Sequence, residues 1–474
     1  MKTQILIDEG VIYTRIAVAE DNILKAIYLD SNLDNHIHDA VIIGEVKNIV
    51  KDLNAAFIDI GSEKNGLLHM NKLPKEYKDK FHQGSRVAVQ VVKENEGDKG
   101  HKLTGFINLV GKHFVCLPFE NVIGISKNIK EESKRKYIYD LISEASKNKY
   151  GIIARTSCTH ATKDEMEKDI YELIKRTDDL INKKDKLSKG TILYKSDPMY
   201  IQIIKDIMYR TDVIEIVCNS EKIQEDIEYF SKEYGHDKGS LIVKVIDKKE
   251  DMFYKYDIEK EISELLRTKV WLKNGGNLII NYTEAMTIID VNSAKSILSK
   301  NHKKAIAQLN KLAVEESIYQ IIRRNLSGII VIDLVDMNEE EDRQDIYDYA
   351  KGLFKKEDQS IVKVYPVTQL GLLCIARNKR YTSFNDKVFT WCSKCGNKYG
   401  RYSLEYLGFL IEQKMRYTAY NTVNKKMYIK TTKELIDYLS SKGVKNSLSN
   451  YYGVQIDLIE DNTLYNTFKV EYIR

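Results

Sequence analysis

The residues best suited to chemistry lie at the ends of two apolar segments. Asp290 and Asn292 end the segment MTIIDVN, and Asp333 lies within GIIVIDLVDM. Side chains two residues apart on a strand point to the same side, so Asp290 and Asn292 share one face. Asp333 interrupts a run that otherwise belongs in a core, where an unpaired carboxylate is costly. It therefore needs a cation or a hydrogen-bond partner.

The elements that position these side chains are predicted to form a βαβ crossover. MTIIDVN predicts a strand, KAIAQLNKLAVEESIYQIIRR a helix, and GIIVIDLVDM a strand buried on both faces. The acids then meet at the carboxyl edge of the sheet, where α/β proteins bind ligands. Two carboxylates and an amide, with no histidine nearby, suit a hard cation such as Mg²⁺. Magnesium accepts phosphate oxygens, so this site points to phosphodiester chemistry.

A purely structural interpretation of the same residues stays open at this point. Asp333 could cap or pair within the fold, and Asp290 could begin an Asx turn with Asn292. Spacing alone favours neither interpretation.

Two cysteines have the spacing of a metal motif. Cys392 and Cys395 form the C-x-x-C pair of WCSKCG, which resembles half of a zinc ribbon. Tetrahedral Zn²⁺ takes four nitrogen or sulfur ligands, and no second C-x-x-C or H-x-x-x-H follows. Either another chain supplies the remaining ligands or the pair holds no metal.

Two further groups of residues have chemistry that suits RNA. GIIART ends in Arg155 and Thr156, whose guanidinium and hydroxyl can bond a phosphate, although such pairs are also ordinary surface chemistry. Phe57, Lys93 and Lys99 combine an aromatic ring with positive charge, as OB folds do when they hold single strands. For a single phenylalanine inside AAFIDIG, plain core packing is the simpler interpretation.

Length and composition predict a globular chain of about three or four domains, because 474 residues exceed one hydrophobic core. Lys+Arg 74 against Asp+Glu 69 permits a polyanionic partner without requiring one. No segment approaches the ~18 apolar residues of a membrane span. The segment MKTQILIDEG lacks the apolar run of a signal peptide, so we expect a cytoplasmic protein.

Local patterns predict the first elements of the chain. Residues 3–30 read as an antiparallel meander, with a turn at Asp21-Asn22. The segment that follows contains five short strands with glycine at the turns, which suggests a small closed barrel of the OB type. Further on, Thr162 and Glu165 have the spacing of a capping box that opens a helix.

Six segments, in order along the chain, resemble motifs of the ribonuclease E/G family. They are AAFIDIGSEKNGLLH, QVVKENEGDKGHKLTGFINLVGKHFVCLP, GIIARTS, VWLKNGGNLIINYTEAMTIIDVNSAK, NLSGIIVIDLVDM and WCSKCG. The resemblance runs from the first residues to about residue 400. It implies a magnesium-dependent endoribonuclease that hydrolyses single-stranded RNA to 5′-phosphate products. Stimulation by a 5′-monophosphate and a role in rRNA maturation or mRNA decay are also implied.

The resemblance further implies a role for each candidate residue. Asp290, Asn292 and Asp333 match the catalytic trio, with the two aspartates as Mg²⁺ ligands. Cys392 and Cys395 match cysteines that share one Zn²⁺ between subunits, so a homodimer or a dimer of dimers is expected. The 5′-phosphate pocket matches Arg155, Thr156, Gly111 and Val115, and the RNA-binding surface of the barrel matches Phe57, Lys93 and Lys99.

The fold implied by the resemblance is multidomain α/β (α+β). An RNase H-like domain is interrupted by an OB-fold barrel and a 5′-sensor region, and a deoxyribonuclease-I-like catalytic domain follows. The expected bounds are 1–38 plus 215–275 for the RNase H-like domain, 39–119 for the barrel, 120–214 for the sensor, 276–388 for the catalytic domain, 389–401 for the zinc link and 402–474 for a small C-terminal domain.

Three departures from the family pattern accompany the resemblance. Leu67 replaces the second barrel aromatic, Asn281 replaces a usual aspartate, and WCSKCGNKYG lacks the usual proline and Gly-Thr-Gly ending. The alternative function is a non-cleaving RNA-binding or scaffold protein of the same fold, against which the intact catalytic trio argues. A DNA endonuclease would share the metal chemistry but is disfavoured by a barrel that binds single strands.

Overall fold

A computed structural model gives the fold of the chain, which divides into two compact units. Unit 1 comprises Met1–Asp34 and Met199–Arg474, and unit 2 comprises Asn35–Pro198. The structure describes residues 3–33, 37–62, 64–93, 100–127, 129–147, 149–159, 161–183, 187–208, 213–233, 241–293, 302–337, 339–358, 360–392, 400–422, 425–461 and 463–471.

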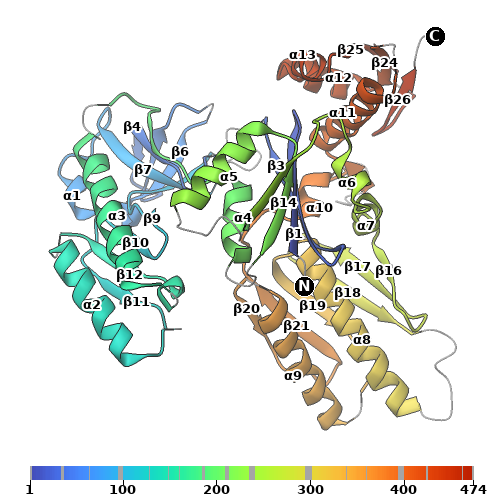
Figure 1. Cartoon of the computed structure of the whole chain (residues 1–474), viewed down its shortest axis with the longest axis horizontal. Coiled ribbons are helices and arrows are strands. Elements are labelled where there is room, and N and C mark those ends of the chain that lie inside the picture. Colours follow the sequence, from blue (N-terminus) through green and yellow to red (C-terminus); the bar gives the residue numbers. More distant parts are fainter. Residues whose placement is uncertain are drawn as a thin grey trace. The chain divides into compact units, whose positions relative to one another are not determined.

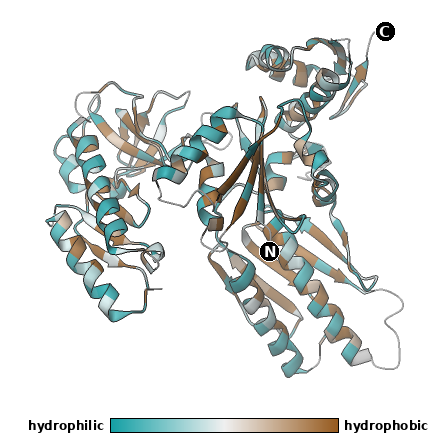
Figure 2. Cartoon of the chain, viewed as in Figure 1, coloured by the Kyte–Doolittle hydropathy of each residue, from teal (hydrophilic) through white to brown (hydrophobic). Residues whose placement is uncertain are grey.

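The first sheet of unit 1 joins both ends of its interrupted sequence. Its strand order is β15-β14-β1-β2-β3, with β1 antiparallel to β2 and parallel to β14. The predicted meander is confirmed, and its turn at Asp21-Asn22 has φ of 49° and 64°, as a tight hairpin turn of this hand requires. In Figure 2 these strands are among the brown, hydrophobic segments. The strands are β1 (Thr3–Glu9), β2 (Tyr13–Glu20), β3 (Ile23–Ser31), β14 (Ile214–Cys218) and β15 (Leu241–Val245).

Two helices pack on this sheet, and one of them, α4, lies in the segment that the sequence assigned to the sensor region. α4 (Met199–Met208) and α5 (Glu221–Glu233) share a buried cluster with alternate residues of β1 and β14. The sequence placed residues up to 214 in the sensor region, whereas the division between the two units falls after Pro198. The physical reason is the apolar face of α4, which is buried against the first sheet.

A second sheet of unit 1 carries the candidate acids, and we call it the acid-bearing sheet. Its strand order is β16-β17-β18-β19-β21-β20. β18 and β19 are parallel and connected through α8, which confirms the predicted βαβ crossover. α8 and α9 lie side by side over one face and complete its core (Figure 1). The elements are β16 (Lys269–Trp271), β17 (Asn277–Tyr282), β18 (Met286–Asn292), α8 (His302–Arg323), β19 (Gly328–Asp333), α9 (Glu340–Glu357), β20 (Val362–Val364) and β21 (Leu372–Arg377).

The remaining elements of unit 1 pack together with the first sheet. α11 and the sheet β25-β24-β26 lie in the segment predicted as a small C-terminal domain, and they share the largest core cluster with β1, β2 and β3. The elements are α6 (Met252–Lys255), α7 (Glu259–Leu265), α10 (Phe384–Val388), β22 (Phe389–Thr390), β23 (Arg401–Tyr402), α11 (Leu404–Asn421), β24 (Lys426–Thr431), α12 (Lys433–Ser441), α13 (Val444–Tyr452), β25 (Gln455–Glu460) and β26 (Phe468–Glu471).

Unit 2 begins with the predicted barrel. Its strands run in the order β13-β4-β5-β6-β8-β7, and an additional pairing of β4 with β7 closes the sheet on itself. The strands are β4 (Val41–Val50), β5 (Ala55–Asp59), β6 (Gly66–His69), β7 (Arg86–Lys93), β8 (Lys102–Thr104) and β13 (Ile192–Tyr194).

The second half of unit 2 is a four-stranded sheet of order β11-β12-β10-β9, covered by α2 and α3. β9 and β10 precede residue 119, so part of the segment predicted as barrel pairs instead with β12. None of the helices in the described ranges combines the length and apolar character needed to cross a membrane. The elements are β9 (Leu109–Val110), β10 (Phe114–Leu117), β11 (Ile123–Ile125), α2 (Glu132–Ser146), β12 (Gly151–Ala154), η2 (Thr156–Thr159) and α3 (Lys163–Lys183).

Candidate active site and RNA interface

The two candidate aspartates are direct neighbours in the acid-bearing sheet. In the parallel pairing of β18 with β19, Asp290 lies opposite Asp333. Their flanking residues Ile289 and Ile332 are fully buried under the helices, so the acids point to the other face. Asn292 shares that face, and its Nδ2 donates to Asp290 Oδ2 at 2.7 Å. The predicted trio therefore converges at the ends of two strands.

The surroundings of Asp333 differ from the prediction. The sequence suggested a buried carboxylate in a strand covered on both faces, but β19 alternates and Asp333 is exposed. Ile330 and Ile332 face the core, while Ile329 is 51% exposed on the opposite side. Within the described ranges, helices cover only one face of this sheet. Asp333 therefore needs no partner to offset a desolvation cost, and its place in the site rests on the register with Asp290.

The loop between β16 and β17 shapes the boundary of the site. A turn at 274–276 connects the two strands, with Gly275 at φ +88°. A Cβ on Gly276 would lie 2.9 Å from the backbone oxygen of Asn292. Only glycine permits so close an approach of this turn to the strand that bears the acids.

The donor set is compatible with a hard divalent cation. Across the residues that the structure describes, no three or more histidine, cysteine or carboxylate side chains gather as a metal site. Asp290 and Asp333 instead offer two adjacent carboxylates that remain open to water. Magnesium commonly binds through one or two carboxylates and retains several waters, so the residues present fit this ion. A cavity of about 360 Å³ lies elsewhere, between residues 264–273 and 312–323, and none of the trio lines it.

The predicted phosphate-binding residues also come together, in unit 2. Arg155 follows β12, and its Nη1 donates to the carbonyl oxygen of Gly111 at 3.0 Å. Thr156 begins η2, and its Oγ1 lies 2.9 Å from Ser126 Oγ. Val115 on β10 pairs with β12 two residues before Arg155. Arg155 and Thr156 are exposed, so a guanidinium and a hydroxyl stand at the same sheet end.

Asp169 organises this site, and the sequence analysis did not find it. The two oxygens of Asp169, on α3, accept backbone N–H bonds from Lys112, His113 and Phe114 at 2.9, 2.7 and 3.1 Å. A Cβ on Gly111 would lie 2.9 Å from Asp169 Oδ1, so the turn between β9 and β10 can approach the carboxylate only with glycine there. No spacing in the sequence connects Asp169 with residues that far away.

His113 lies within the same turn and is almost fully buried. Its Nδ1 lies 3.2 Å from Ser157 Oγ, and its Nε2 has no hydrogen-bond partner among the described residues. Burial lowers the pKa of His113 to about 4, and the nearby Asp169 carboxylate opposes part of this shift. The imidazole is therefore neutral at physiological pH.

The candidate RNA surface of the barrel forms a continuous cross-strand row. Phe57 pairs with Leu67, Leu67 with Lys102, and Lys102 with Lys93. Phe57 is half-buried and lies outside the barrel core, which takes its neighbours Ala56 and Ile58. The simpler interpretation of Phe57 as a core residue is therefore wrong. Lys102 was missed, although the alternation in HKLT places it opposite the predicted residues.

The chain matches two sequence families. Residues 35–104 match the S1 RNA binding domain, which confirms the predicted OB-type barrel and assigns RNA binding to it. Residues 108–380 match the Ribonuclease E/G family. The chain belongs to the ribonuclease E/G family. The prediction of an endoribonuclease of this family is confirmed at that level.

Curated relatives with related names cover most of the chain. The chain is 28% identical to Ribonuclease G of Haemophilus influenzae over 404 residues, which are 82% of this chain and 81% of the relative. It is 27% identical to Ribonuclease G of Escherichia coli K12 over 417 residues, 85% of this chain and 84% of the relative. With Ribonuclease E of Nostoc it shares 26% identity over 400 residues, 81% of this chain and 58% of the relative.

Two predicted residues of this ribonuclease E/G family member lie outside the described part of the chain: Lys99 of the barrel and Cys395 of the zinc link. Cys392 is described and buried, and its Sγ lies 3.3 Å from Tyr465 Oη. Leu67, where the family resemblance leads one to expect an aromatic, stands directly beside Phe57. The row therefore offers one aromatic ring and two lysines to a base and its backbone.

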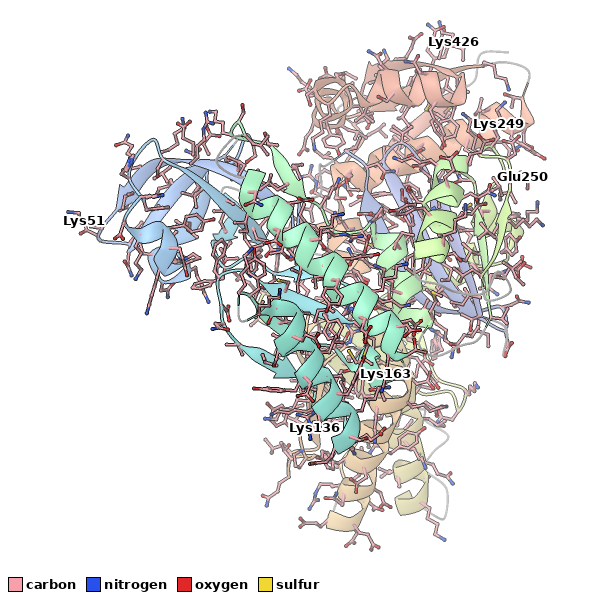
Figure 3. All side chains as sticks on the ribbon, turned by 60° about the vertical axis from the view of Figure 1, so that its left-hand side comes forward. Lys51, Lys136, Lys163, Lys249, Glu250 and Lys426 are labelled. Atoms are coloured by element: carbon pink, nitrogen blue, oxygen red, sulfur yellow. The ribbon has the colours of Figure 1, made fainter. Side chains whose placement is uncertain are left out.

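Positive charge is spread over both units. Figure 3 labels Lys51, Lys136 and Lys163 in unit 2 and Lys249 and Lys426 in unit 1, and each side chain projects from its ribbon. With a formal net charge of only +5, no single strongly basic face is needed to account for the composition.

Proposed function

We propose that this chain is a magnesium-dependent endoribonuclease that hydrolyses single-stranded RNA to 5′-phosphate products and is stimulated by a 5′-monophosphate. The register of Asp290 opposite Asp333 on the open side of the acid-bearing sheet carries this proposal. The match to the S1 domain and the names of the relatives support RNA as the substrate.

The chain's own residues have distinct tasks in the proposed reaction. Asp290 and Asp333 would hold Mg²⁺, which when bound offsets negative charge on the scissile phosphate. Asn292 fixes the orientation of Asp290 through its hydrogen bond, so the carboxylate does not have to reorganise during catalysis. Phe57, Lys93 and Lys102 bind the strand through stacking and charge. Arg155 and Thr156 bind a terminal 5′-phosphate.

The decisive experiment is incubation of the purified protein with 5′-monophosphorylated, A/U-rich single-stranded RNA, with and without Mg²⁺. Asp290→Asn and Asp333→Asn should abolish cleavage while RNA binding is retained, because the change removes metal ligands and leaves the barrel intact. Asp345→Asn, an exposed acid on α9, serves as the matched control. Turnover at the unmutated rate in either site variant would exclude this centre. Binding without cleavage by the unmutated protein would favour an RNA-binding scaffold.

A further inference from the structure

The face of the acid-bearing sheet opposite α8 and α9 carries an exposed tryptophan that the proposed reaction does not use. We call this the open face. Trp271 on edge strand β16 belongs to it, because the preceding residue Val270 packs into the helix-covered core, and the side chain is 66% exposed. At the sheet edge Trp271 also borders the cavity between β16 and α8. The Nζ of Lys269 lies 4.1 Å from the centroid of the indole ring. An exposed aromatic ring beside a cation has the chemistry to stack on a base and to contact the adjoining phosphate.

The strand register connects this pair to the candidate acids. Lys269 pairs with Ile279, which pairs with Asp290, and Asp290 lies opposite Asp333. In the next row, Trp271 pairs with Asn277 and Asn277 with Asn292. Strands in a sheet are about 4.8 Å apart, so Trp271 stands roughly 10 Å across the sheet from Asn292.

The opposite edge of the same sheet repeats the arrangement. Lys363 lies on β20, and its Nζ is 4.7 Å from the centroid of the Tyr365 ring, which is 40% exposed. The Tyr365 N–H donates to Cys374 O at 2.9 Å, so the ladder with β21 continues to this residue. Val362 and Val364 pack into the helix-covered core, which places Lys363 and Tyr365 on the open face.

We propose that the open face is a track for single-stranded RNA, in which bases on the two sides of the scissile phosphate stack on Trp271 and on Tyr365. This inference rests on the proposed function, because it takes the acids as the place of cleavage. Aromatic rings bind bases of any identity by stacking, and Lys269 and Lys363 supply charge for the adjoining phosphates. The two edge strands thus hold the strand over the central acids.

The first test measures kcat and KM for Trp271→Ala and Tyr365→Ala on one 5′-monophosphorylated RNA. Each variant should raise KM by roughly 5- to 100-fold with little change in kcat, as loss of one stacked base predicts. Trp271→Phe should retain most of the affinity because it keeps an aromatic face. Tyr254→Ala is the matched control, since Tyr254 on α6 is 76% exposed and lies on no strand of this sheet.

A second readout does not depend on cleavage. The chain contains two tryptophans, so the change in fluorescence on RNA addition can be compared between the unmutated protein and Trp271→Phe. Quenching that is lost in Trp271→Phe supports stacking on Trp271. Equal quenching in both proteins overturns it. A signal that follows protein concentration and ignores RNA overturns it as well, in favour of a second copy of the chain on this face.

Substrates with single abasic nucleotides identify the stacked bases. If Trp271 stacks on one base, an RNA lacking that base should show the same KM with tryptophan or alanine at 271, because each change removes the same interaction. A penalty that persists with every abasic position overturns the track. Quenching that depends on Trp271, without cleavage, would support the track and overturn the proposed function. Cleavage that no change at 271 or 365 affects would support the proposed function and overturn the track.

Discussion

At the residue scale, the Arg155 guanidinium is hydrogen-bonded to the described residues through one of its three nitrogens, and this leaves the group able to bind a ligand. Its Nη1 donates to the Gly111 carbonyl, while its backbone N–H donates to the carbonyl of His113 at 2.8 Å. These bonds fix the direction of the side chain. Among the described residues, the other guanidinium nitrogens have no hydrogen-bond partner, so they are available to a phosphate beside Thr156.

Arg155→Ala should remove the preference for 5′-monophosphorylated RNA. The lost charge-assisted hydrogen bonds to a terminal phosphate are worth about 1.5–3 kcal/mol. Initial rates on two RNAs that differ only in a 5′-monophosphate or a 5′-hydroxyl check this expectation, and basal cleavage of the hydroxyl form should survive. Equal rates on both RNAs with the unmutated protein would mean that this pocket does not sense the 5′ end.

His113 should make unit 2 sensitive to mild acid. Burial lowers its pKa to about 4 in the folded state, against about 6.5 in the unfolded chain. Its contribution to stability is therefore complete above pH 6.5 and is lost as the pH falls toward 4, by as much as about 3 kcal/mol. Urea unfolding of the unmutated protein and of His113→Gln should be measured between pH 4 and 7.5. The free energy of unfolding should depend less on pH in the variant. Parallel curves would contradict this assignment.

The residues of the candidate site were predictable from the sequence where the two-residue alternation of a strand was enough to place them. Asp290 and Asn292 share a face because they are two apart on a strand, and the sequence shows that directly. The exposure of Asp333 was not predictable, because it depends on which face of the sheet the helices cover. Asp169 acts through hydrogen bonds to a turn more than fifty residues away. Such contacts follow from tertiary packing and leave no local signal.

At the scale of elements, a buried ionic network joins α11 to the first sheet. Asp8 Oδ2 accepts hydrogen bonds from Arg15 Nη2 and from Arg416 Nη1, each at 2.8 Å. Glu412, one turn earlier on α11, accepts the backbone N–H bonds of Val11 and Ile12 between β1 and β2. Burial alone would raise the pKa of Asp8, but Arg416 and Arg15 outweigh it and the pKa is lowered. Helix α11 and the first sheet are therefore held together by these buried bonds.

Arg416→Leu should destabilise unit 1 by about 3–5 kcal/mol, because Asp8 loses one of two buried cationic partners. Lys430→Ala, which removes a surface pair with Glu471, is the control and should change the midpoint of urea unfolding little. Since the folded pKa of Asp8 is lowered, its stabilising contribution is present at neutral pH and is lost on acidification through that pKa. An unfolding midpoint unchanged in Arg416→Leu would exclude the network as a stabilising element.

Helices, strands and turns were predictable from the sequence where a short pattern of neighbouring residues specifies them. The capping box at Thr162 and Glu165 is present, since the Thr162 N–H donates to Glu165 Oε2 at 2.8 Å. The hairpin at Asp21-Asn22 and the βαβ crossover also follow from short patterns. The association of α4 with unit 1 does not, because an apolar helix face shows only that it is buried and not against which sheet.

At the scale of the whole molecule, we propose that Cys392 and Cys395 bind zinc together with a second copy of the chain. Cys392 is buried beside Tyr465, and with Cys395 it provides two thiolates per chain. Four ligands are required for a structural zinc site, and no group of three or more possible ligands is found among the described residues. Under this proposal a second copy supplies the other two thiolates, as in a symmetric dimer.

Zinc should then be present at about one ion per two chains, and Cys392→Ser combined with Cys395→Ser should release it and lower the mass in solution. Metal analysis gives the stoichiometry, and light scattering at several protein concentrations gives the mass. Cys374→Ser, at a half-buried thiol on β21, controls for the loss of a cysteine elsewhere. Two thiolates from each chain must act together for the ion to join them, so the loss of zinc and the loss of mass should occur together. A dimer that persists in the double variant without zinc would show that other surfaces hold the subunits together. The two cysteines would then have no role in joining the chains.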